Sequence, residues 1–124
     1  MIASEKTLLV IEDIEENSQM LKRRLEKASY NVEVAEDGQE GFLLLSRRDI
    51  SLILLDLDMP VMNGFTFLEK IKADKNYSHI PVVITSSLDD EDTMNDCLAF
   101  GSVGFMSKPY KMDIILSHIE SCLN

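Results

Sequence analysis

Short apolar runs recur along the chain at fairly even intervals, and longer segments with helical spacing separate them. The longer segments place apolar residues three or four positions apart, as at Leu21 and Leu25 and again at Leu68 and Ile71. The short runs are rich in branched side chains, which favours strands over helices. They are TLLVI (7–11), VEVA (32–35), SLILL (51–55), PVVIT (81–85) and VGFMS (103–107). The pattern therefore predicts a strand followed by a helix, repeated five times.

This alternation predicts a parallel sheet, because a parallel return between strands needs a crossover and a helix is the usual one. Strands covered on both faces are nearly all apolar, as 7–11, 51–55 and 81–85 largely are. The second run alternates with Glu33, so we expect it at an edge of the sheet. The fold class that follows is α/β, a three-layer doubly wound sandwich. Ligands of such sheets bind beyond the carboxyl ends of the strands, where the winding direction reverses.

The composition is that of an ordinary globular protein, with 45% hydrophobic and 27% charged residues in a chain of 124. This length predicts one domain, 1–124, with a core over about 6–123. The formal charge of −10 argues against direct binding to nucleic acid or anionic lipid, because both would be repelled.

Neither a membrane segment nor a metal-binding cysteine motif is visible. No run approaches the roughly 20 apolar residues that a membrane helix needs, and the N-terminal segment lacks the pattern of a signal peptide. Cys97 and Cys122 stand alone, so we interpret them as small buried or half-buried apolar residues. We therefore expect a cytoplasmic protein.

Polar side chains stand where four of the predicted strands end. A carboxylate at the end of a buried strand is costly unless a cation, a hydrogen bond or solvent stabilises it. If these four strands are neighbours, their end groups converge on one shallow site that suits phosphate and magnesium, since magnesium prefers carboxylate and phosphate oxygens. The residues are Glu12 and Asp13 after the first strand, Asp56 after the third, Ser86 and Ser87 after the fourth and Lys108 shortly after the fifth.

In order and spacing these residues resemble the receiver domain of two-component response regulators, over residues 6 to 123. The resemblance implies a five-stranded sheet of flavodoxin-like strand order 2-1-3-4-5. It also implies that Asp56 accepts a phosphoryl group, with magnesium, from a histidine kinase or a histidine phosphotransfer protein. The chain would then catalyse only its own phosphorylation and dephosphorylation.

The resemblance also implies a role for each neighbour of Asp56. Asp13 and Asp56 bind magnesium, Glu12 does so through a water, and Asp58 contributes its backbone carbonyl. Lys108 is a point charge that pairs first with Asp56 and then with the bound phosphoryl oxygen.

The same resemblance suggests how phosphorylation becomes a signal. A phosphoryl group adds about −1.5 to −2 charges, which would draw the Ser86 hydroxyl toward it and let Phe105 rotate into the vacated space. The face built from the fourth helix, fifth strand and fifth helix would then change shape, dock an unspecified protein target and could support a dimer.

Simpler interpretations of these residues stay open. Glu12 and Asp13 could form a solvated turn at a helix start, and Asp56 could be an ordinary strand-end acceptor. Phe105 could be a core aromatic, and Ser87 could only fill space. The acidic run 89–92 suits a helix cap and first turn, and the apolar Leu88 predicts slow hydrolysis of the phosphorylated form.

Two other classes of function compete with the phosphoacceptor switch. The Asp56-Leu57-Asp58 segment matches the DxD motif of haloacid-dehalogenase-like phosphohydrolases, although that motif normally follows the first strand and the chain is short for that fold. A receiver-like scaffold that never carries phosphate is the other. The intact set of acidic, hydroxyl and lysine residues argues against the scaffold.

Overall fold

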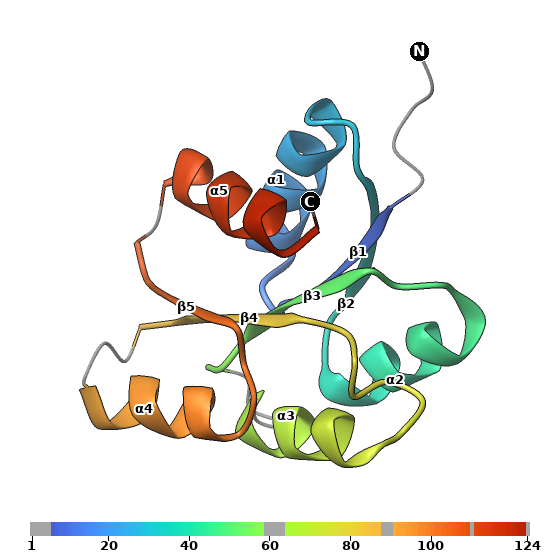
Figure 1. The fold of residues 1–124 in the computed structure, drawn as a ribbon. Helices are drawn as coiled ribbons and strands as arrows, with labels where there is room; N and C mark the ends of the chain where they lie inside the picture. The colour runs from blue at the N-terminus through green and yellow to red at the C-terminus, as the bar shows by residue number, and fades with distance from the viewer. Residues whose placement is uncertain (1–5, 59–63, 88–90, 110, 124) are drawn as a thin grey trace.

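The computed structural model describes residues 6–58, 64–87, 91–109 and 111–123, and strands alternate with helices throughout (Figure 1). The acidic residues 89 and 90, Leu88 and the segment 59–63 lie outside these ranges. The elements are β1 (Thr7–Ile11), α1 (Glu15–Lys27), β2 (Asn31–Ala35), α2 (Gly38–Arg47), β3 (Leu52–Asp56), α3 (Gly64–Ala73), β4 (Val82–Ser86), α4 (Glu91–Ala99), β5 (Gly104–Ser107) and α5 (Met112–Leu123).

The five strands form one parallel sheet in the order β2-β1-β3-β4-β5. The predicted fold class and strand order are therefore confirmed. β2 is an edge strand, as the alternation at Glu33 predicted. The winding direction reverses between β1 and β3, since β2 lies on one side of β1 and the later strands lie on the other. The carboxyl ends of β1 and β3 thus flank the point where such folds bind ligands.

Alternate residues of the strands face opposite sides of the sheet, and each side has its own apolar core. On one side Leu9, Ile53 and Val82 belong to a cluster that includes Phe67 of α3 and Cys97 of α4. On the other side the cluster consists of residues from the strands, α1 and α5, namely Leu8, Val10, Leu21, Leu25, Val32, Leu52, Leu54, Val83, Met106, Ile115 and Ile119. Figure 1 shows α1 and α5 over one face and α2, α3 and α4 over the other. These layers hold the strand ends in fixed relative positions.

The observed third and fourth strands begin and end one residue later than the apolar runs predicted. The backbone N–H of Leu57 donates to the carbonyl of Thr85 at 2.9 Å, and Asp56 pairs with Thr85, so the ladder continues through Asp56. Pro81 has no N–H to donate, although its carbonyl accepts from Ile53 at 3.0 Å. As a result Asp56 and Ser86 are themselves strand residues with a fixed backbone.

Gly64 brings the start of α3 against the backbone that follows Asp56. A Cβ added at Gly64 would lie 2.7 Å from Cα of Leu57 and 3.0 Å from the carbonyl oxygen of Asp56. Backbone atoms cannot move aside as a flexible side chain can, so this close packing requires a residue without a side chain.

The remaining structural predictions concern the cysteines and membrane segments. Cys97 is buried and Cys122 half-buried, and both are free thiols, as predicted. Across the described ranges, no helix combines the length and apolarity needed to cross a bilayer.

Candidate functional site

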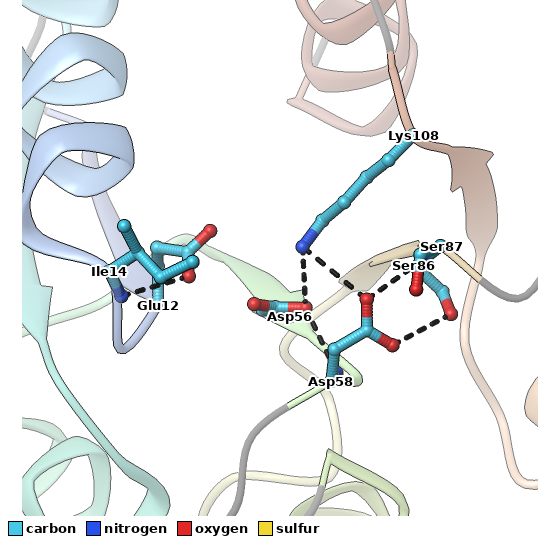
Figure 2. A network of polar contacts seen from close by, with 7 residues as sticks. All are labelled: Glu12, Ile14, Asp56, Asp58, Ser86, Ser87 and Lys108. Carbon is cyan, nitrogen blue, oxygen red and sulfur yellow. Dashed lines mark hydrogen bonds and ion pairs between the residues drawn. The ribbon is translucent and has the colours of Figure 1, made fainter.

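The predicted site residues meet at the carboxyl edge of the sheet (Figure 2). Asp56 is the last residue of β3, and Glu12 directly follows the neighbouring strand β1. Ser86 ends β4 on the other side of β3, and Lys108 directly follows β5. The sheet order therefore brings together groups that are far apart in the sequence.

Three carboxylates form an acidic cluster at the ends of β1 and β3. Glu12, Asp13 and Asp56 each place one carboxylate oxygen so that all three atoms lie within 4.8 Å of one another. Glu12 and Asp56 are both 3% exposed, whereas Asp13 is exposed. These hard oxygen donors at short separation fit magnesium, which binds through one or two carboxylates and keeps several waters. The solvated-turn interpretation is therefore wrong for Glu12, which is buried. It agrees with the exposure of Asp13.

The buried Glu12 carboxyl holds a proton more tightly than usual. Burial raises its pKa from 4.5 to about 7, and hydrogen bonding to Asp56 and the charge of Asp56 act in the same direction. The backbone N–H of Ile14 donates to Glu12 Oε2 at 3.1 Å, and this bond, with the charge of Lys108, opposes the rise. The negative charges of the acidic cluster are thus incompletely balanced, and a bound cation would neutralise them.

Lys108 supplies the one cationic side chain that contacts this cluster within the described residues. Its Nζ lies 3.0 Å from Asp56 Oδ1 and 3.5 Å from Asp58 Oδ2. Burial alone would lower the pKa of Lys108, but the hydrogen bond to Asp56 and the charges of Asp56, Glu12 and Asp58 raise it overall. Lys108 therefore stays charged, and it is only 23% exposed.

The Asp56 carboxylate has two different sides. Its Oδ1 accepts a hydrogen bond from the backbone N–H of Asp58 at 2.9 Å and another from Lys108 at 3.0 Å. In Figure 2 the other oxygen points toward Glu12, away from the lysine. One side of the carboxylate thus faces the acidic cluster, and the other faces a cation.

The Asp58 side chain makes contacts that the sequence did not predict. Asp58 Oδ1 accepts from the Ser86 hydroxyl at 3.2 Å, and Oδ2 accepts from the backbone N–H of Ser87 at 2.9 Å (Figure 2). Burial alone would raise the pKa of Asp58, but hydrogen bonds from Ser87 and Ser86 and the charge of Lys108 lower it overall. Any non-proline residue could supply the backbone bond, but the Ser87 hydroxyl also hydrogen-bonds to Asp58, so the serine side chain does more than fill space.

The two residues of the predicted switch lie on neighbouring strands. Ser86 is fully buried at the end of β4, and Phe105 lies on β5 in register with Ile84. Phe105 is partly buried and packs against the core cluster on the α3 and α4 side. The interpretation of Phe105 as a core aromatic therefore holds for this structure, and its rotation stays a prediction.

Comparisons with known proteins identify the family and the fold. A family profile described as response regulator receiver domain matches residues 8–120. The response regulator PleD of Caulobacter vibrioides is 35% identical over 114 residues, which are 92% of this chain and 25% of PleD. The chain therefore spans about a quarter of that relative.

Solved structures show the same fold. The chemotaxis protein CheY4 of Vibrio cholerae superposes with a TM-score of 0.90 at 26% identity, covering 97% of this chain and 100% of CheY4. The receiver domain of a signal transduction histidine kinase from Syntrophus aciditrophicus gives 0.87 at 30% identity, covering 95% of this chain and 89% of that one. The strand order of the sheet and the profile match indicate the same family. This chain accordingly belongs to the response regulator receiver domain family, the phosphoryl-accepting modules of two-component signalling.

Proposed function

We propose that Asp56 is the phosphoryl acceptor of this receiver domain and that Lys108 and the acidic cluster are its catalytic partners. The observation that carries the proposal is the two-sided environment of Asp56. Its Oδ1 lies 3.0 Å from the Lys108 ammonium, and its carboxylate shares a 4.8 Å cluster with Glu12 and Asp13. A carboxylate between a cation site and a fixed cation suits attack on a dianionic phosphoryl group.

In the transfer, an oxygen of Asp56 forms the new O–P bond while the bond between phosphorus and the donor breaks. The electron pair of the broken bond leaves on the imidazole nitrogen of a phosphohistidine, or on the carboxylate oxygen of a small acyl phosphate. The product on the protein is an acyl phosphate. No residue other than Asp56 is required to form a covalent bond.

The chain's other residues hold charge in place during this step. Asp13 and Asp56 would bind magnesium directly, Glu12 through water, and Asp58 through its backbone carbonyl. When bound, the ion neutralises charge on the equatorial phosphoryl oxygens. Lys108 remains protonated. Its ammonium group can pair first with Asp56 and then with the bound phosphoryl oxygen.

We further propose that the modification is read through Ser86 and Phe105 and changes the face of α4, β5 and α5. The donor would be a histidine kinase or histidine phosphotransfer protein, which the similarity to a kinase receiver domain supports. The target would be a protein that docks on that face, and phosphorylation could also favour a dimer. The net charge of −10 disfavours nucleic acid as a direct target.

The test is phosphorylation by phosphoramidate with magnesium, followed by intact mass spectrometry. The natural protein should gain one phosphoryl group, and chelation of magnesium should abolish the gain. Asp56→Asn should stay unlabelled, whereas Asp96→Asn, which removes an exposed carboxylate on α4, should label normally. Lys108→Ala should label at a rate lower by about 100- to 1,000-fold, the usual range for the loss of one electrostatic stabiliser.

The same experiment separates the competing functions. A natural protein that never labels with a competent donor would favour a scaffold. Repeated turnover of a phosphate ester such as p-nitrophenyl phosphate would favour a phosphohydrolase, because the receiver reaction is limited to its own side chain.

A further inference from the structure

The Asp58 carboxylate accepts hydrogen bonds from donors near the phosphoryl acceptor Asp56. Its two oxygens accept hydrogen bonds from the Ser86 hydroxyl at 3.2 Å and from the Ser87 backbone N–H at 2.9 Å. Lys108 Nζ, which contacts Asp56 at 3.0 Å, also lies 3.5 Å from Asp58 Oδ2. Three donors, from the last residue of β4, the residue after it and the segment after β5, therefore converge on a carboxylate that is not the acceptor (Figure 2).

Lys108 already contacts Asp56, and Ser86 and Ser87 stand at the carboxyl end of β4, the strand next to β3. A phosphoryl group on Asp56 would therefore compete with Asp58 for these donors. A backbone N–H carries one hydrogen, and so does a hydroxyl, so neither can bond fully to Asp58 and to a phosphoryl oxygen at once. Lys108 has three hydrogens and can serve both groups. A second negative charge held at this place would also repel the incoming phosphoryl group.

Asp58 is placed so that it can withdraw. It is 27% exposed, whereas Asp56 is 3% exposed and Ser86 is fully buried. Its contacts with Ser86, Ser87 and Lys108 are made by its side chain, from a residue just beyond the end of β3. A turn of this side chain toward solvent would free the Ser86 and Ser87 donors without moving the sheet.

We propose that Asp58 is a positioning residue that acts as an internal competitor of the phosphoryl group. In the unphosphorylated protein its carboxylate holds the Ser86 hydroxyl and the Ser87 N–H. On phosphorylation of Asp56, the Asp58 side chain turns toward solvent, and the Ser86 hydroxyl and the Ser87 N–H donate to the phosphoryl oxygens instead. This inference rests on the proposed function and goes beyond the backbone carbonyl role given to Asp58 above. It makes Asp58 a determinant of how readily the phosphorylated conformation forms.

The test measures the affinity of beryllofluoride, a non-covalent mimic of the phosphoryl group, at saturating magnesium. The signal is the backbone amide resonance of Ser87 in NMR spectra of the full chain. Asp58→Asn keeps the size of the side chain and one acceptor oxygen but removes the charge. We expect its affinity to rise about three- to tenfold, as removal of one partly exposed opposing charge implies. Asp58→Ala, which removes both acceptor oxygens of Asp58, should bind at least as tightly as Asp58→Asn.

Asp96→Asn is the matched control, because it removes the same charge from an exposed position on α4. It should leave the affinity within twofold of the natural protein. A second readout is the Ser87 amide in the absence of beryllofluoride. It should move in Asp58→Ala toward its position in the bound natural protein, and stay unchanged in Asp96→Asn.

Two results would overturn the inference and leave the proposed function standing. One is that both Asp58 variants bind beryllofluoride as the natural protein does. The other is that both bind it more weakly while remaining folded by circular dichroism, which would make Asp58 a supporting acceptor instead of a competitor. Failure of the natural protein to bind beryllofluoride would instead contradict the proposed function itself. Asp56→Asn should not bind in any case.

Discussion

Glu12→Gln should make the metal-free protein more stable, and the gain should grow as the pH rises. Glu12 has a pKa of about 7 in the folded protein and 4.5 as its ordinary value. The folded state therefore binds this proton more tightly than the unfolded state does. The stability linked to Glu12 is fully present below about pH 4.5, falls as the pH rises through 7, and then levels off.

The size of the effect follows from the two pKa values. At ~1.4 kcal/mol per pH unit, the two pKa values correspond to at most ~3–4 kcal/mol of stability. Of this, roughly 2–3 kcal/mol should be lost between pH 5 and pH 8. Gln cannot ionise, and its amide oxygen can still accept the hydrogen bond that the Ile14 N–H gives Glu12 at 3.1 Å. The natural protein should therefore lose stability relative to Glu12→Gln across this range.

The assay is urea unfolding followed by far-ultraviolet circular dichroism, with a chelator present, at several pH values from 5 to 8. Glu16→Gln is the control, because Glu16 is an exposed carboxylate in the first turn of α1. Its profile should run parallel to that of the natural protein. Parallel plots of unfolding free energy against pH for the natural protein and Glu12→Gln would contradict this expectation. Glu12 would then bind its proton equally in the folded and unfolded states.

Three further predictions concern the frame around the site. Gly64→Ala should destabilise the fold by about 2–3 kcal/mol in urea unfolding, because the new Cβ meets the backbone of Leu57. Gly104→Ala should cost about half as much, because its new Cβ meets a side chain. Equal losses of stability in the two variants would contradict this. Asp37→Ala removes the cap of α2 and should cost ~1 kcal/mol in the same assay, and no loss would show that the cap is dispensable. Ser86→Ala should still label at Asp56 but lose the NMR shift changes on α4, β5 and α5 that follow phosphorylation; retention of all these changes would rule out the switch.

Much of the fold was predictable because its signals are local. Branched apolar runs of strand length and the segments between them define the alternation, and Glu33 alone indicates the edge position of β2. The strand bounds were wrong by one residue at Asp56 and Ser86. An apolar run ends where the side chains change, whereas a strand ends where the ladder bonds end. The bond from the Leu57 N–H to the Thr85 carbonyl extends β3 one residue past Leu55, the end of the predicted run.

The site was predictable in its membership but not in its details. The side-chain contacts of Asp58 with Ser86 and Ser87 join residues 28 and 29 positions apart, and no local pattern indicates them. Glu12 and Asp13 are neighbours in sequence, yet one is buried and the other exposed. That difference depends on how the end of β1 meets β3, which the sequence alone does not define.

Chemical trapping identifies the residue that carries the phosphoryl group, which we propose to be Asp56. Borohydride reduces an acyl phosphate on an aspartate to homoserine, so peptide mapping of the phosphorylated, reduced protein identifies the modified residue. We expect homoserine at position 56, dependent on magnesium and absent from Asp56→Asn. Homoserine at position 13 or 58 in the natural protein, or phosphorylation that persists in Asp56→Asn, would contradict this proposal.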